Sequence, residues 1–279
     1  MEPFVIILDL DGTIIGDCSY QCDLYNIQDI LRRNIKSSPN FSKSKTECDK
    51  ILNNSYNSDS LLIRPYFLKF FETIKKIYPN NFIYVFTASE KTWANKEIAI
   101  IEKQNNIKFN RPIFTRDNCI IDKNGMIKKS VKKIMPILLK SMKIEKSYDI
   151  SKRLLIIDNN PTFIDYQDNF ILCPSYNYIK FNNIWDGISN EYFKCKELKN
   201  FILKLTFSKK MHNIKQLSKP EKQEKLYKWL YKKHKNINNY NCGYINDTFW
   251  RDLSVLIKHH NIKEFNKTIV SSIQKSIKN

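Results

Sequence analysis

The amino-acid sequence predicts an α/β fold with a mainly parallel sheet. Short β-branched and apolar runs, typical of strands buried on both faces, occur at Phe4–Leu8, Phe82–Phe86 and Arg153–Ile157. Segments with the 3.6-residue spacing of amphipathic helices separate these runs, and such alternation is the pattern of a parallel sheet. The 279 residues are also enough to bury a sizeable core.

The first half of the chain follows this alternation closely. Pro65 suits the first position of a helix, because the N–H that proline lacks has no helical partner there. The polar segment Lys36–Ser60, rich in Ser, Asn and Lys, predicts a loop or mobile insertion. The other expected elements are helices over residues 21–34, 65–78 and 89–104, a short strand Pro112–Phe114 and a hairpin Cys119–Ile127.

The second half continues in the same way. A helix is expected over Ser130–Met142, kinked or divided by Pro136, and a fourth strand over Phe170–Cys173. The helix Glu191–Phe207 would close this domain. We therefore expect one domain over residues 1–207, with residues 14–63 as an insertion or flap.

The last part of the chain is helical and basic in character. Helices are expected over residues 219–236 and 246–278, so residues 208–279 are predicted to form a small C-terminal domain. Residues 200–279 contain 17 Lys/Arg and 5 Asp/Glu, and the net charge of the whole chain is +19. Such a region favours nucleic acid, phosphorylated protein or an acidic partner, although lysines that merely solvate helix faces give the same pattern.

Cysteine usage and hydropathy indicate the compartment. The seven cysteines are odd in number and lack paired metal spacing, so neither a disulfide framework nor a zinc site is expected. No signal peptide precedes the first strand, and no apolar run approaches the ~20 residues that span a bilayer. The sequence predicts an intracellular protein, cytoplasmic or nuclear, with free thiols and no membrane partner.

Polar residues follow the three buried strands. Asp9, Thr87 and Asp158 each stand where a strand ends, and parallel strands place their carboxyl ends at one edge of the sheet. A carboxylate such as Asp9 can attack phosphorus and form an aspartyl-phosphate. Asp11, two residues later, can act as the acid and base. Mg²⁺ suits a site of this kind, because it binds carboxylates together with substrate phosphate.

The remaining chemistry requires groups that bind phosphate. Thr87 and a lysine of residues 128–133 are suitable donors for phosphoryl oxygens. The four histidines, at positions 212, 234, 259 and 260, all lie in the C-terminal region. Carboxylates are therefore the expected acid–base groups.

The stretch Phe4–Thr13 resembles the first motif of the haloacid dehalogenase superfamily of phosphohydrolases. Within it, the chain is most similar to the small phosphatases of the RNA polymerase II carboxy-terminal domain and their NLI-interacting factor-like relatives. Further segments match that family in order and spacing over residues 4–206: Arg64-Pro65, Val85–Ser89, Trp93-Ala94-Asn95, Phe114–Cys119, Met126–Lys129 and Ile156–Pro161.

The resemblance implies a Rossmann-like, three-layer fold and a set of residue roles. It makes Asp9 the nucleophile and Asp11 the acid and base. The implied phosphate-binding residues are Thr87, Ala88 and Lys128, and the implied Mg²⁺ ligands are Asp9, Asp11, Asp158 and Asn159. The implied reaction is hydrolysis of phosphoserine or phosphothreonine in protein, with the polymerase tail as a candidate substrate.

Two departures from the family pattern affect specificity. Gly12 stands where the small polymerase-tail phosphatases usually carry Glu, and residues 14–63 are polar where those enzymes have a small β-insertion with an apolar pocket. Only 40 residues separate Thr87 from Lys128, which leaves no room for a large cap. An open cleft favours macromolecular substrates.

Two other functions remain open from the sequence. Polynucleotide 3′-phosphatases share the D-x-D-G-T motif, and the chain is basic. A catalytically idle adaptor that binds nucleic acid is the second alternative. Trp185, Trp229 and Trp250 could then stack on bases, although Trp229 and Trp250 have the helical spacing of core residues.

Overall fold

The computed structural model describes most of the chain, in two compact units. The described residues are 2–37, 39–57, 60–145, 147–180, 195–206, 236 and 239–278. The first unit consists of Met1–Asp17, Tyr56–Tyr178 and Tyr244–Asn279, and the second of Cys18–Ser55 and Ile179–Gly243.

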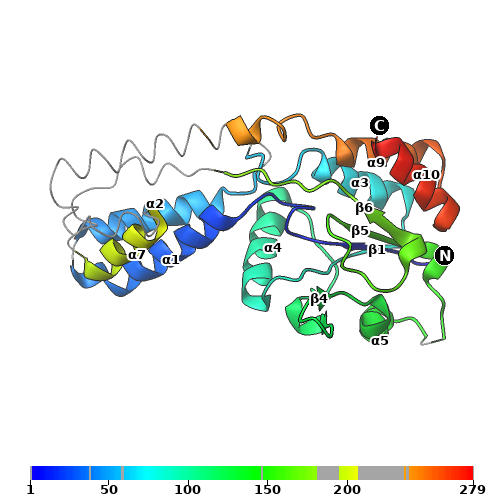
Figure 1. Cartoon of the computed structure of the whole chain (residues 1–279), viewed down its shortest axis with the longest axis horizontal. Helices are drawn as coiled ribbons and strands as arrows, with labels where there is room; N and C mark the ends of the chain where they lie inside the picture. The colour runs from blue at the N-terminus through cyan, green and yellow to red at the C-terminus, as the bar shows by residue number, and fades with distance from the viewer. Residues whose placement is uncertain are drawn as a thin grey trace. The chain divides into compact units, whose positions relative to one another are not determined.

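The first unit is built around a four-stranded parallel sheet (Figure 1). Its strands are β1 (Phe4–Leu8), β2 (Asn81–Val85), β5 (Leu154–Asp158) and β6 (Phe170–Leu172), in the order β2-β1-β5-β6. Every residue of β1 and β5 is buried, as expected for strands covered on both faces. The prediction of an α/β fold with a parallel sheet is confirmed.

One face of the sheet packs against helix α5 (Val131–Met142). Alternate strand residues, among them Val5, Ile7 and Ile156, join α5 in a single hydrophobic cluster, since successive strand residues point to opposite faces. The helix continues through Pro136 instead of dividing there, at the cost of one main-chain hydrogen bond.

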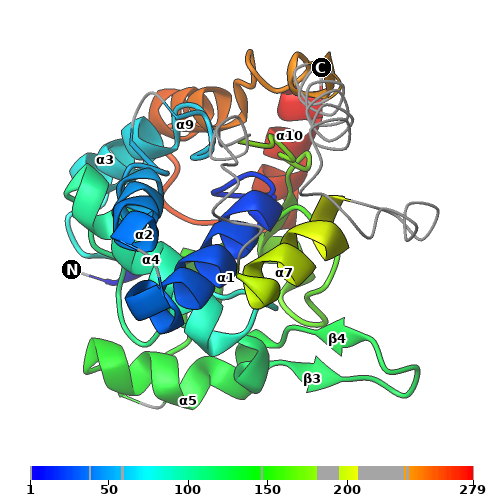
Figure 2. The ribbon, with the colours of Figure 1, turned by 90° about the vertical axis from the view of Figure 1, so that its left-hand side faces the viewer.

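The opposite face is covered by α3 (Phe67–Ile77), α9 (Phe249–His259) and α10 (Lys267–Lys278), which lie above the sheet in Figure 1, with α5 below it. Figure 2 shows the same helices at the top and α5 at the bottom. The apolar stripe of α9 is fully buried against α3. On α10, Gln274 exchanges two hydrogen bonds with the main chain of Leu172 in the edge strand β6, at 2.8 and 2.9 Å.

Residues 244–279 are therefore part of the unit that contains the sheet, whereas the sequence assigned them to a separate C-terminal domain. The expected helix 246–278 is two helices, α9 and α10. The apolar spacing of these helices correctly indicated a buried face, but spacing does not show which element covers it.

The remaining elements of the first unit are short, apart from one helix. The predicted helix at 89–104 is present as α4, the hairpin is present, and the expected strand Pro112–Phe114 is reduced to a single parallel bridge between Phe86 and Phe114. The elements are α4 (Lys91–Asn105), β3 (Ile120–Ile121), β4 (Ile127–Lys128) and the 3₁₀ turns η2 (Arg116–Asn118), η3 (Ser151–Arg153) and η4 (Gln167–Asn169).

The second unit contains three described helices, α1 (Ser19–Arg33), α2 (Pro39–Asn53) and α7 (Lys196–Thr206), and the turn η1 (Ile35–Ser37). The prediction of a loop over Lys36–Ser60 is wrong for α2. Its buried residues Phe41, Cys48 and Leu52 are spaced by about two turns and one turn, so they form a narrow stripe that packs on α1. The polar composition of this segment hides that stripe.

Several predictions fall outside the described residues. The predicted helix 219–236 and its lysines, the start of the helix predicted at 191–207, Trp185 and Trp229 all lie there. Within the described part of the chain, no helix is both long and apolar enough to cross a bilayer.

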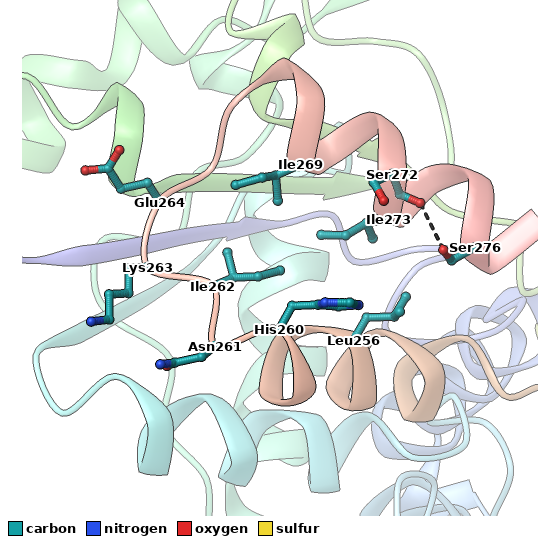
Figure 3. Close-up of a pocket in the computed structure, with 10 residues that line it drawn as sticks. All are labelled: Leu256, His260, Asn261, Ile262, Lys263, Glu264, Ile269, Ser272, Ile273 and Ser276. Atoms are coloured by element: carbon teal, nitrogen blue, oxygen red, sulfur yellow. Dashed lines mark hydrogen bonds between the residues drawn. The ribbon is translucent and has the colours of Figure 1, made fainter.

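The loop between α9 and α10 borders a pocket of about 440 Å³ (Figure 3). Ile262, Ile269 and Ile273 point into the same space, and His260 and Leu256 line its α9 side. None of the predicted site residues lines this pocket.

An ion pair ties the C-terminal segment to the start of α3. Arg64 donates two hydrogen bonds to the carboxylate of Asp247, at 2.9 and 2.8 Å, and its guanidinium stacks over Phe249 at 4.6 Å. The Arg64 side chain is 0% exposed and that of Asp247 is 14% exposed. A buried charge that loses its partner is strongly unfavourable.

We therefore expect Arg64→Leu to lower the free energy of unfolding by about 3 kcal/mol, because Asp247 is left buried without its cation. Urea denaturation followed by circular dichroism measures this change. The control is Arg32→Ala, which removes an exposed pair with Asp29 and should cost less than about 1 kcal/mol. Equal effects of the two variants would contradict the stabilising role of the buried pair.

Candidate active site

Three strand ends place polar side chains at one edge of the sheet. Asp9 follows β1, Thr87 follows β2 after one residue, and Asp158 is the last residue of β5. Because β1 lies between β2 and β5, these positions are neighbours. The structure thus brings together the residues that the strand pattern predicted to meet.

Asp9 and Asp158 share one buried cation, the ammonium of Lys129. Its Nζ lies 2.6 Å from Asp9 Oδ1 and 2.8 Å from Asp158 Oδ2. Burial raises the pKa of Asp9 to about 7, opposed by Lys129 and assisted by the negative charges of Asp158 and Asp11. Burial acts to lower the pKa of Lys129, but the two carboxylates outweigh it and hold that pKa above its usual value. Lys129 is therefore a permanent cation in the site.

The sequence placed Lys128 at this position, and the structure corrects that assignment by one residue. Lys128 is the last residue of β4, pairs with Ile120 in the hairpin and is only partly buried. Neighbouring residues of an extended chain point to opposite sides, so a shift of one residue exchanges the side chain inside for the one outside. Lys129 is the lysine that points toward Asp9.

The main chain of Lys129 is fixed by the segment that follows β5. Its N–H donates to the carbonyl of Thr162 and its carbonyl accepts from Ile164, both at 3.0 Å. The next residue, Ser130, caps α5 by accepting from the N–H of Lys133 at 3.1 Å. Asp165 accepts from the Ser130 hydroxyl at 2.6 Å, which joins the cap to the same segment.

Asp11 faces the loop after β2. Its Oδ2 accepts hydrogen bonds from Ser89 Oγ at 2.6 Å and from Thr87 Oγ1 at 3.3 Å. The N–H of Ser89 also donates to Thr87 Oγ1 at 3.1 Å. Ala88 lies between them, with its carbonyl accepting from Arg116 Nε at 2.8 Å. These bonds hold the Asp11 carboxylate at the strand edge, only partly buried.

Gly12 is required by the geometry of the loop between the two aspartates. Its φ of +79° favours glycine, and a Cβ at this position would lie 2.5 Å from the side-chain nitrogen of Asn159. The glutamate found in the small polymerase-tail phosphatases would not fit this conformation. The chain thus departs from the family pattern at Gly12, where the side chain of Asn159 approaches the main chain closely.

Thr13 completes the loop through its hydroxyl group. Thr13 Oγ1 lies 3.3 Å from Asp9 Oδ2, and it accepts from the main-chain N–H of Asn159 at 3.1 Å. The side chain of Thr13 is fully buried. It therefore links the first motif to the residue that follows β5.

The donor set fits a divalent cation. Asp9, Asp11, Asp158 and Lys129 together carry a formal charge of −2, which Mg²⁺ would neutralise. One polar atom of the Asn159 amide lies 3.2 Å from both Asp9 Oδ2 and the Asp11 carbonyl oxygen. Without a cation the amide nitrogen suits this position, because it can donate to both oxygens. A bound Mg²⁺ would instead be met by the amide oxygen together with Asp9 Oδ2 and the Asp11 carbonyl oxygen.

The fit of the site to Mg²⁺ depends on an amide and a main-chain carbonyl as well as on acidic side chains. Among the described residues, no three His, Cys, Asp or Glu side chains form a group that would hold a metal. Mg²⁺ usually binds one or two carboxylates together with water and substrate phosphate, so the two carboxylates, the amide and the carbonyl are sufficient.

Sequence reasoning missed Thr13 and Ser89 as members of this site, whereas Lys129 lies within the run of residues 128–133 from which a lysine was expected. Thr13 and Ser89 lie inside the quoted motifs, so their positions close to Asp9 and Thr87 were a usable signal. The cysteine that matches the family, Cys119, is buried, and burial raises the pKa of its thiol.

We expect Lys129→Gln to lower the free energy of unfolding at pH 8 by about 3 kcal/mol, because two buried carboxylates lose the ammonium group that lies between them. Lys128→Gln is the matched control and should cost less than about 1 kcal/mol, since that side chain is only partly buried. Urea denaturation of the two variants tests the one-residue correction, and a larger loss for Lys128→Gln would reverse it.

Comparisons with known proteins give one extensive match, to a protein family, and two distant similarities to solved structures. The sequence matches no curated protein. Two solved structures are similar over 98% of this chain and 70% of their own: the RNA polymerase II CTD phosphatase Fcp1, at 17% identity and a TM-score of 0.38, and a variant of fission yeast Fcp1 bound to beryllium fluoride, at 16% identity and a TM-score of 0.39. These scores are too low to carry an argument.

The match to a family model is extensive. The model of the NLI interacting factor-like phosphatases matches residues 4–215, which include every predicted site residue. It confirms the resemblance seen in the sequence motifs. The chain belongs to the NLI interacting factor-like phosphatase family.

Proposed function

We propose that this chain is a Mg²⁺-dependent phosphatase that transfers the phosphoryl group of its substrate to Asp9. The observation that carries the proposal is the buried pair of Asp9 and Lys129, with a second carboxylate, Asp11, two residues away. The family consists of phosphatases, which supports the same reaction class. Carboxylates perform both covalent and acid–base steps here, since neither described histidine, His259 or His260, belongs to the site.

The first step forms a bond between a carboxylate oxygen of Asp9 and phosphorus. The bond from phosphorus to the leaving oxygen breaks, and Asp11 in its protonated form gives its proton to that oxygen. The products are the free alcohol, an aspartyl-phosphate at Asp9 and an ionised Asp11.

The second step releases the phosphate. Asp11 takes a proton from a water molecule, whose oxygen attacks phosphorus and displaces the Asp9 carboxylate. Asp9 returns to its ionised form and Asp11 is again protonated. The hydroxyl group of Ser89 holds Asp11 in place during both steps, which leaves the Thr87 hydroxyl group available to the phosphoryl oxygens.

Thr87, the main chain at Ala88 and Lys129 are the proposed phosphate-binding groups, with Lys129 in place of Lys128. Lys129 sits beside the Asp9 carboxylate, so its charge stabilises phosphoryl oxygens that approach Asp9.

The proposed Mg²⁺ ligands are Asp9, Asp158, Asn159 and the Asp11 carbonyl. When bound, the metal neutralises charge on the transferring phosphoryl group.

The proposed substrate is a phosphoserine or phosphothreonine protein of the polymerase-tail type. The motif order over residues 4–206 is that of phosphatases with such substrates, and the family match extends over the same residues. The proposed compartment is the cytoplasm or nucleus, as the odd number and unpaired spacing of the cysteines in the sequence predict.

A polynucleotide 3′-phosphatase is the second candidate, and the net charge of +19 favours it. Charge of this size attracts the backbone of nucleic acid. Its greatest excess lies in residues 200–279, and many of those lysines are outside the described part of the chain. The same charge would suit an acidic protein partner.

We expect Asp9→Asn to lower kcat for p-nitrophenyl phosphate by at least about a thousandfold, because the amide cannot act as the nucleophile. Chelation of Mg²⁺ should abolish the activity of the unaltered chain, and added Mg²⁺ should restore it. Circular dichroism checks that the variant is folded. Activity within tenfold of the unaltered chain would exclude Asp9 as the nucleophile.

The role of Asp11 has a separate test. Asp11→Asn should slow hydrolysis of a phosphoserine peptide by about 100-fold or more, and that of p-nitrophenyl phosphate by less, because nitrophenolate leaves without a proton. Comparing kcat/KM for the two substrates measures the difference. Equal losses would show that Asp11 does not protonate the leaving group.

Substrate class is decided by direct comparison. Phosphate release from phosphoserine heptad peptides should exceed release from 3′-phosphorylated oligonucleotides of matched charge at equal concentration. The opposite order would favour the polynucleotide phosphatase. Salt-dependent binding of nucleic acid with no Mg²⁺-dependent turnover would favour the idle adaptor.

A further inference from the structure

A segment beyond the family match contacts the first motif directly. The match ends at residue 215, whereas Trp250 lies near the start of α9. The indole Nε1 of Trp250 donates a hydrogen bond to the main-chain carbonyl of Thr13, at 3.3 Å in the buried interior. Thr13 is the residue whose hydroxyl group touches Asp9.

Trp250 is rigidly held in this position. Its side chain is 0% exposed. Its ring lies 5.2 Å from Phe67, 4.5 Å from Phe70 and 4.9 Å from Phe249, measured between ring centroids. Aromatic packing on several sides fixes the indole plane, and therefore the direction of its N–H.

A second connection reaches the same loop from the same segment. Asp247 holds the guanidinium of Arg64, and the main-chain N–H of Arg64 donates to the carbonyl of Ile14 at 2.8 Å. Residues 247 and 250 thus support two consecutive carbonyls of the loop, those of Thr13 and Ile14. Both contacts lie within the first unit.

We propose that Trp250 is a positioning residue that holds the Thr13 end of the motif loop, and with it the Asp9 carboxylate, in the geometry needed for attack on phosphorus. Asp247 assists through Arg64. The proposal rests on the proposed role of Asp9. It assigns a catalytic support function to residues 244–279, which lie outside the family match.

The proposal predicts an effect on the chemical step and little effect on substrate binding. Loss of the N–H releases the Thr13 carbonyl, so Thr13 Oγ1 no longer holds Asp9 Oδ2 in one place. The proposed phosphate-binding groups at Thr87 and Lys129 follow β2 and β4, and neither is among the described partners of Trp250. A small displacement of a nucleophile is enough to slow a reaction substantially.

The test is Trp250→Phe in the full chain, which keeps an aromatic ring and removes the donor. We expect kcat for p-nitrophenyl phosphate to fall about tenfold with KM within about twofold of its original value. Val255→Ala is the control, because Val255 is on the same helix and is 58% exposed. That variant should keep both constants. A kcat within twofold of the original in folded Trp250→Phe overturns the proposal.

A second variant covers the case in which Trp250→Phe does not fold. Asp247→Asn keeps the size of the side chain and weakens the contact to Arg64, and it should lower kcat by about threefold at constant KM. If Trp250→Phe does not fold, an unchanged kcat in Asp247→Asn overturns the proposal. Melting temperatures of all variants identify those that remain folded at the assay temperature.

Hydrogen exchange separates this proposal from the proposed function. In Trp250→Phe, but not in Val255→Ala, amide exchange over residues 10–16 should accelerate by about tenfold or more. If the unaltered chain hydrolyses no phosphate ester, the proposed function fails, and faster exchange still supports the link between Trp250 and the loop. Unchanged exchange shows that the link is absent.

Discussion

The rest of the site depends on one buried ammonium group between two carboxylates. A lysine is stable in the interior only when opposite charges lie within hydrogen-bonding distance, and Lys129 meets this requirement through Asp9 and Asp158. That arrangement requires β1 and β5 to be adjacent and parallel, and it requires the segment after β5 to bind the main chain of Lys129. The order of the strands therefore determines which charged side chains meet in the site, and those charges in turn stabilise that order. The formal negative charge that remains in the site is suited to a divalent cation, and a phosphate ester can bind together with that cation.

Much of the sheet was predictable because its strands are buried on both faces. Such strands are continuous apolar runs without polar alternation, and β1 and β5 both show this pattern. The helix α2 was not predictable, because it buries only a narrow stripe within a polar segment. The placement of α9 and α10 was missed for another reason. Their apolar faces were visible in the sequence, but the partner of an apolar face is determined by contacts between residues far apart in the chain.

The site likewise contains residues that the sequence could group together and residues that only the folded structure could place. Asp9, Thr87 and Asp158 could be grouped because each ends a strand, and strand ends meet at one edge of the sheet. The lysine was displaced by one residue, because the two lysines at 128 and 129 are equivalent in sequence and differ only in the direction of their side chains. Nothing in the sequence near Trp250 links it to the first motif. Its spacing indicated a core residue, which it is, and its hydrogen bond to Thr13 required the folded structure.

The support of the first motif by α9 has a consequence for the synthesis of the protein. Thr13 and Trp250 are separated by 237 residues, and Arg64 and Asp247 by 183. At about 5–20 residues per second, the ribosome makes the motif loop roughly 10–50 s before it makes the tryptophan. During that interval the α3 surface that α9 will cover stays exposed, with Phe67 and Phe70 at its centre. The nascent chain therefore carries every residue of the first motif while it still lacks Trp250 and the helix that covers the α3 surface.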